Sequence, residues 1–234
     1  MVLDKPKEIQ ALELLLKRVT GTEKAQIISQ LSRHYTAAEP VPLLRAAAMN
    51  YMLDQVPKEV LTRENLLSVY AGDTVIFIAA GAGELHQIPQ EVLTIELLSA
   101  PNSKKITSYH EAASCGHLHQ IPSALITAET MTLQDRDGYT PAYWAIRKGQ
   151  AYLLPTDVLN ENVLLAPTWN NDNALQWAVS EGNLDQLIGV PLSEQCRDIV
   201  GVEWFEKNQK YLLKQQLLKE QLLENAETNE LELF

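Results

Sequence analysis

Residues 110–127 read HEAASCGHLHQIPSALIT, and residues 77–94 read FIAAGAGELHQIPQEVLT. The two stretches share the phrase LHQIP and a closing threonine, and the numbers of their matching residues differ by 33. A phrase that returns at a fixed interval of this length is typical of proteins built from stacked supersecondary units. The spacing therefore predicts a repeat protein.

Several residue types keep the same spacing over four successive stretches, which we call units. A threonine or asparagine, an alanine and a glycine each recur at steps of 33, and a proline does so after a first step of 32. The four series are Thr74, Thr107, Thr140 and Asn173; Ala79, Ala112, Ala145 and Ala178; Gly83, Gly116, Gly149 and Gly182; and Pro57, Pro89, Pro122 and Pro155. Since chance does not hold several residue classes in one register over this length, the sequence predicts a solenoid.

Each unit predicts two short helices joined by the LxQIP phrase. The threonine or asparagine is a good N-cap, the alanines let neighbouring helices approach closely, and the glycine ends the first helix. The proline suits the first turn of the second helix, where its missing N–H costs nothing. A later threonine (Thr62, Thr94 or Thr127) predicts the cap of one further turn.

The unit from Asp135 to Gly149, DRDGYTPAYWAIRKG, resembles the ankyrin repeat, whose pattern is D-x-x-G-x-T-P-L-H-x-A-A-x-x-G-H-L. The matching residues are Asp135, Gly138, Thr140, Pro141, Ala145 and Gly149, to which the preceding unit adds His110, Ala112, Ala113, Gly116, His117 and Leu118. The resemblance covers about residues 41–191 and is to a divergent, bacterial-looking variety. It implies an all-α, ankyrin-like helical repeat solenoid whose short hairpins form no real sheet.

Some features depart from the ankyrin pattern. The QIP phrase and a later LTxE turn replace the leucine-rich second helix. The hairpins around 99–106 and 166–172 lack the D-x-x-G core, which leaves their conformation open. The first unit keeps only its alanines and the phrase LDQVP.

The period is absent at both ends of the chain. Residues 1–40 contain two amphipathic helix patterns and predict an N-terminal cap. Residues 192–234 predict a long amphipathic helix over about 202–223, followed by an acidic stretch expected to fray. Its leucine doublets predict a wide apolar stripe that caps the last unit, with a homodimer through this helix as the alternative.

Bulk composition limits the function classes. The chain has 234 residues and a net charge of -11, which argues against direct nucleic-acid binding because phosphates are neutralised by Lys and Arg. Two cysteines outside any CxxC pair favour a reducing compartment, and no apolar run is long enough for a membrane span. We therefore expect a cytoplasmic protein that does not associate with a membrane.

No metal, cofactor or catalytic site is predicted. The group His110, Cys115, His117 and His119 lacks the paired spacing of zinc sites, and its histidines have ordinary places in the ankyrin pattern. Asp135 and Asp137 resemble the start of a calcium loop, but the twelfth position would be Ile146, which cannot bind the ion. No GxSxG, Cys–His or HExxH arrangement is present, so we do not expect an enzyme.

The resemblance implies that partners bind to hairpin tips and to the exposed face of the first helices. Residues at these positions are Tyr70, Asp73, Lys104, Lys105, Arg136, Tyr139, Arg147, Lys148, Trp169 and Asp172. Basic residues gather on the middle units, which favours an acidic partner surface. Trp144 and Trp177 hold equivalent positions and are expected to be packing residues, whereas Trp169 falls at a hairpin tip.

These features predict a non-catalytic module that recognises another protein through a concave face of hairpins and helices. Two alternatives remain open. One is a phage or bacterial inhibitor or immunity-type protein that covers an enzyme, including a mode in which acidic residues mimic nucleic acid. The other is a bacterial effector delivered to a host cell.

Overall fold

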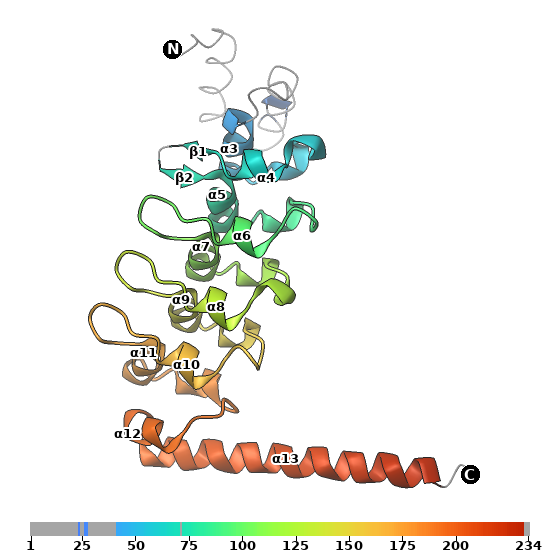
Figure 1. Ribbon diagram of the computed structural model, residues 1–234, viewed down its shortest axis with the longest axis vertical. Coiled ribbons are helices and arrows are strands. Elements are labelled where there is room, and N and C mark those ends of the chain that lie inside the picture. The colour runs from blue at the N-terminus through green and yellow to red at the C-terminus, as the bar shows by residue number, and fades with distance from the viewer. Residues whose placement is uncertain (1–22, 24–25, 28–40, 71, 232–234) are drawn as a thin grey trace.

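The computed structural model describes residues 23, 26–27, 41–70 and 72–231, and it describes side chains over 44–69 and 72–223 of the main body. The described chain is mostly helical, as predicted (Figure 1). The predicted N-terminal cap over 1–40 lies almost wholly outside the described residues.

Five inner helices form the spine of the molecule. They are α3 (Val41–Met49), α5 (Val75–Ala82), α7 (Ser108–Cys115), α9 (Pro141–Arg147) and α11 (Ala174–Ser180). From α5 onwards they begin at equal steps of 33 along the chain, and each packs against the next along the long axis of the molecule (Figure 1). Loops project on one side of this spine and short helical turns on the other.

The predicted caps and small residues explain the inner helices. The Thr74 and Thr140 side chains accept hydrogen bonds from the Phe77 and Tyr143 N–H groups, at 3.2 and 3.1 Å. The four alanines of the repeating series have no exposed surface. Because an alanine adds only a methyl group, it allows the backbones of successive helices to approach closely.

The second half of each unit is made of short turns. The LxQ phrase forms 3-10 helices η1 (Leu53–Gln55), η3 (Leu85–Gln87), η4 (Leu118–Gln120) and η7 (Leu184–Leu187), and the sequence AYL forms η6 (Ala151–Leu153) at the corresponding place. Two further 3-10 helices, η2 (Lys58–Val60) and η5 (Ser123–Leu125), precede α4 (Arg63–Leu66) and α8 (Ala128–Met131); α6 (Ile95–Leu98) and α10 (Glu161–Leu164) follow in the other units.

The prediction of a second helix that begins at the proline of each unit is wrong, because the chain there forms at most a single helical turn. Pro57 and Pro122 stand one residue earlier, at the N-caps of the single turns η2 and η5. The chain after Pro89 and Pro155 forms only a turn. The later caps are confirmed, because Thr62, Thr94 and Thr127 begin α4, α6 and α8.

The glutamine of the LxQ phrase joins two of the units to the units before them. The Gln120 amide donates to the Gly83 carbonyl at 2.7 Å and accepts from the His86 N–H at 3.4 Å. Gln186 makes the same two kinds of contact with Ile146 and Ala151. We call this side of the molecule, formed by the 3-10 helices, the joint side. In these two units the glutamine satisfies backbone groups of its neighbour, whereas the Gln87 amide bonds to the His86 ring in its own unit.

The loops share one conformation despite their different sequences. Strands β1 (Val69–Tyr70) and β2 (Asp73–Thr74) form a minimal antiparallel pair, which is the one departure from an all-helical chain among the described residues. The left-handed conformation recurs at equal steps of 33, at Gly72, Lys105, Gly138 and Asn171. The loops around 99–106 and 166–172 therefore adopt the turn of the Asp135 loop without its glycine.

The last unit is covered at its far end. Three elements follow α11, namely η8 (Glu194–Cys196), α12 (Arg197–Val200) and α13 (Val202–Leu231). Phe205 is buried, and the buried Asn208 amide accepts from the Gly189 N–H at 2.7 Å and donates to the Val190 carbonyl at 2.9 Å. The first part of α13 is therefore fixed to the last unit, as expected of a cap.

Beyond Leu212 the helix α13 leaves the body (Figure 1). It continues past the predicted end into the stretch that was expected to fray. The exposed leucines are Leu213, Leu217, Leu218, Leu222 and Leu223. The doublets are spaced by five residues, which turn a helix by about 500°, so successive doublets are rotated by about 140°. They spiral around α13 and do not form the predicted single stripe.

Candidate functional site

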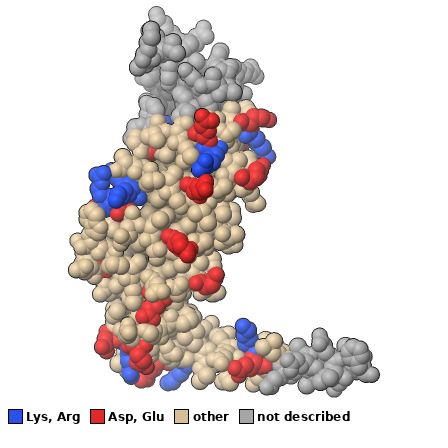
Figure 2. Space-filling view, viewed as in Figure 1, with Lys and Arg blue, Asp and Glu red and all other residues tan. Residues whose placement is uncertain are grey.

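The loop tips carry an exposed row of basic and aromatic residues. Lys104, Lys105, Arg136 and Trp169 are exposed, and we call this row the loop edge. Figure 2 shows a compact group of Lys and Arg side chains on the loop side of the body. Elsewhere on that view, acidic and basic side chains are interspersed.

Backbone hydrogen bonds fix the loop edge. The Arg136 N–H donates to the Lys104 carbonyl at 3.0 Å, and the Trp169 N–H donates to the Asp137 carbonyl at 3.4 Å. The Arg136 guanidinium also donates to the Ser103 carbonyl at 2.9 Å. The row is therefore presented on loops whose backbones are joined to one another.

The acidic residues predicted at the tips make bonds within the loops. Asp73 is half-buried and accepts from the Asn102 amide at 2.9 Å, and Asp172 accepts from the Thr168 hydroxyl. These contacts place Asp73 and Asp172 in the loop framework rather than among the freely exposed side chains. The side chain of Tyr70 lies outside what the structure describes.

Trp169 is a highly exposed aromatic residue at the tip of its loop. Its side chain is 68% exposed, although its backbone is bonded to the preceding loop. A Cβ atom built on Gly138 would come within 2.7 Å of the Trp169 nitrogen and ring. Gly138 therefore allows the Trp169 loop to lie against its neighbour, with the indole directed outward.

An aromatic cluster lies beside the loop edge on the inner helices. The Tyr143 ring contacts Tyr139, Trp144 and Trp177, with ring centroids 4.9, 5.9 and 6.5 Å away. Trp144 and Trp177 are half-buried, as expected of packing residues. The exposed Arg147 guanidinium lies 5.1 Å from the centre of the Trp144 ring. The predicted residues Tyr139 and Arg147 thus belong to one surface.

A cleft of about 290 Å³ separates these aromatic residues from α7. Its lining residues are Ile106, His110, Glu111, Ser114, Asp135, Trp144 and Lys148. His110 and Asp135 are buried and engaged in hydrogen bonds. Lys148, a predicted site residue, is exposed at this cleft.

Glu111 was not among the predicted site residues. It is half-buried, and a Cβ on Gly81 would lie 2.8 Å from its Oε1 atom. Burial raises the pKa of the Glu111 carboxyl, the Cys115 thiol 3.7 Å away opposes this, and repulsion from Asp73 adds to the increase. The sequence could have indicated Glu111, because the equivalent positions of the other units, at steps of 33 residues, hold the apolar residues Ile78, Trp144 and Trp177.

The histidines have separate structural places. The His110 Nδ1 atom accepts from the Thr107 N–H at 3.2 Å, so Nε2 carries the proton and donates to the Tyr139 carbonyl at 3.1 Å. His117 contacts the Ala80 carbonyl at 3.3 Å, and His119 is exposed. Over the residues that the structure describes, no three His, Cys, Asp or Glu side chains are grouped as metal ligands.

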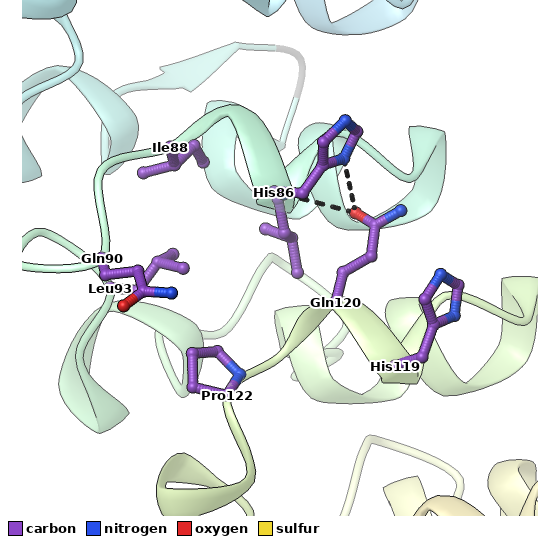
Figure 3. A pocket seen from close by; sticks show the side chains of 8 residues that line it. His86, Ile88, Gln90, Leu93, His119, Gln120 and Pro122 are labelled. Carbon is purple, nitrogen blue, oxygen red and sulfur yellow. Dashed lines mark hydrogen bonds between the residues drawn. The ribbon is translucent and has the colours of Figure 1, made fainter.

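A second hollow, of about 470 Å³, lies on the joint side (Figure 3). Its lining includes Ile88, Leu93 and Pro122. The His86 ring and the Gln120 amide lean toward one another across it, whereas His119 lies apart. Because its polar groups bond across successive units, this hollow belongs to the joint and does not present a set of free ligands.

No model of a known protein family matches the chain, and no curated protein matches it. None of the helices formed by the described residues combines the length and the apolar character that a membrane crossing requires.

Proposed function

We propose that the chain is a non-catalytic, ankyrin-type solenoid that binds another protein through its loop edge and inner helices. The equal spacing of the inner helices and the common loop conformation support the solenoid. In this proposal the protein is cytoplasmic. It uses no cofactor and makes no direct contact with nucleic acid.

The exposed indole of Trp169, beside the aromatic and basic residues of the inner helices, carries this proposal. Single exposed apolar residues are ordinary on protein surfaces. Here a tryptophan, tyrosines and arginines lie on neighbouring loops and on the inner helix α9, and these three residue types dominate the binding energy of protein interfaces. A partner that buries Trp169 would remove its apolar surface from water without having to order the loop first.

Photo-crosslinking tests the face. A photoreactive phenylalanine is placed at Trp169 in one protein and at Tyr152 in another, and each is irradiated in native lysate. Tyr152 lies in η6 on the joint side and is 79% exposed, more than Trp169, so it is a matched aromatic control. We expect a protein adduct from position 169 that is absent from position 152.

Competition then separates binding from random capture. Unlabelled wild-type protein should abolish the adduct, whereas the double variant Trp169→Ala, Arg147→Glu should not. Identical adducts at both positions, or an adduct that the double variant removes equally well, would contradict the proposed face.

A further inference from the structure

We propose that the cleft between α7 and α9 receives an arginine side chain of the protein partner, with the Glu111 carboxylate as its acceptor. The inference rests on the proposed function for the origin of this arginine. The chemistry of the cleft is argued from its own residues.

Glu111 is a charged residue in a row of apolar ones. The equivalent positions of the other units hold Ile78, Trp144 and Trp177. Gly81, on the neighbouring helix α5, provides the room that the carboxylate occupies. A charge at such a place loses hydration, so it is unfavourable unless another group compensates it.

The compensating group is missing among the described residues. The Glu111 carboxylate accepts one weak bond, from the Cys115 thiol at 3.7 Å, and no described Lys or Arg forms an ion pair with it. Lys148 lines the same cleft but stays exposed and unpaired with it. Nearby Asp73 adds negative charge. A cation entering the cleft would find an acceptor that the chain itself leaves open.

Two other polar residues of the cleft are held in the loop framework. His110 bonds to Thr107 and to Tyr139, and the Asp135 Oδ1 atom accepts from the backbone N–H groups of Asp137 and Tyr139. Asp135 is buried, whereas Glu111 is half-buried. Glu111 is therefore the more accessible carboxylate of this cleft.

The walls favour arginine over lysine. A guanidinium group is planar, donates two parallel hydrogen bonds to a carboxylate and stacks on aromatic faces, whereas an ammonium group is a compact and strongly hydrated charge. Trp144 forms one wall, and its ring already has the Arg147 guanidinium 5.1 Å from its centre. Ile106 provides an apolar wall for the methylene groups of the incoming side chain.

The test uses the full chain and three blocked amino acids. Isotope-labelled protein is titrated with acetyl-arginine amide, acetyl-lysine amide and the uncharged acetyl-citrulline amide, and amide shifts are followed by NMR. We expect the arginine probe to give saturable shifts around Glu111 and Ser114, with the lysine probe weaker and the citrulline probe without effect.

Two variants locate the acceptor. Glu111→Gln keeps the shape and removes the charge, and it should weaken arginine binding about tenfold, the scale of one charge-assisted contact. Glu181→Gln removes an exposed carboxylate after α11 and should leave binding unchanged. The melting temperature of each variant verifies that it folds, and Glu111→Gln should not melt lower, because it removes a desolvated charge.

Arginine shifts no larger than those of citrulline, or unchanged by Glu111→Gln, would overturn the cleft proposal. If the crosslink at position 169 persisted in that case, the protein-binding face would stand without an arginine in its cleft. If the arginine probe bound as expected but no face-specific adduct formed, the cleft chemistry would stand and the protein origin of the arginine would be overturned.

Discussion

On the joint side four of the five units keep the LxQ phrase, with η6 as the exception, whereas on the inner helices the solvent-facing positions differ. Leu85 and Leu118 are both fully buried, and the glutamine that follows each keeps its place in the LHQ phrase. The row that begins at Ile78 changes to a glutamate and then to two tryptophans. Both sides have the period of 33 residues. The difference in residue variation between them therefore reflects what each position contacts.

Stacking explains the constancy of the joint side. A residue that satisfies the backbone of the neighbouring unit has the same task in every unit, and only a few side chains fit it. The solvent-facing row has no task that all units share, because Trp144 and Trp177 pack against Tyr143 whereas the Glu111 carboxylate contacts the Cys115 thiol. Glu111 is therefore the member of the row that packing explains least.

The largest expected effect is on the joint side. Leu118→Ala deletes a fully buried side chain and should lower the free energy of unfolding by about 2–5 kcal/mol, the range for such cavities. Trp169→Ala, at the exposed loop edge, should change it by less than about 0.5 kcal/mol. Urea unfolding midpoints measure both. Comparable losses would mean that the two sides do not differ in the way described.

The two parts of α13 should also separate. Asn208→Ala leaves the Gly189 N–H and the Val190 carbonyl without their partner and should cost about 1–3 kcal/mol. Leu217→Ala should cost almost nothing in the monomer, because that side chain is half exposed on the projecting part. A large loss from Leu217→Ala, or a fall in mass on sedimentation, would instead indicate that leucines of α13 are buried in a homodimer.

Features that repeat within the chain could be predicted from its sequence. Caps and buried alanines each depend on residues within one or two units, and comparison among units brings them out. The loop around Lys105 could not be predicted, because its left-handed residue is not a glycine. Its shape is held by bonds that Asn102 makes within the loop and by a bond from the Ser103 N–H to the Gly72 carbonyl of the adjacent loop.

The candidate site was predicted in part. The resemblance predicted the residues of the loop edge. The sequence did not show that Asp73 and Asp172 bond within the loops whereas the basic residues are exposed, because the hydrogen-bond partners of the two acids depend on the folded loops. The position of the Glu111 carboxylate depends on the space left by Gly81 on the neighbouring helix α5, which the sequence around Glu111 does not reveal. The spiral of leucine doublets was readable from their spacing of five, which the prediction of one stripe overlooked.

Two glycines measure how firmly the loops are joined. Gly138 and Gly149 both have a positive φ, of 80° and 69°, so an added Cβ strains either by about 1–2 kcal/mol. Only at Gly138 would this Cβ also collide with the Trp169 backbone, at 2.7 Å. Gly138→Ala should therefore destabilise more than Gly149→Ala, and it should increase hydrogen exchange at the Trp169 amide. Equal losses would show that the loops are not held against each other.

The smallest effect concerns His110, whose buried ring links two units. Burial lowers the pKa of His110 below its ordinary value, although the Tyr139 carbonyl and Asp135 oppose this. The unfolded chain then binds a proton as the pH falls below about 6.5 while the folded chain does not, so stability is lost on acidification from that point down to the folded pKa. One such group changes the free energy of unfolding by at most about 1.4 kcal/mol per pH unit.

Glu84 and Glu111 act oppositely, because burial raises the pKa of each and their ionisation at higher pH disfavours the folded state. The measurement is therefore the difference between wild type and His110→Gln, in urea unfolding at pH 7.5 and 5.5, in which the carboxyl contributions cancel. Wild type should lose more stability than His110→Gln over this interval, while His119→Gln, at an exposed position, should behave as wild type does. An equal loss in wild type and His110→Gln would place the acid sensitivity elsewhere.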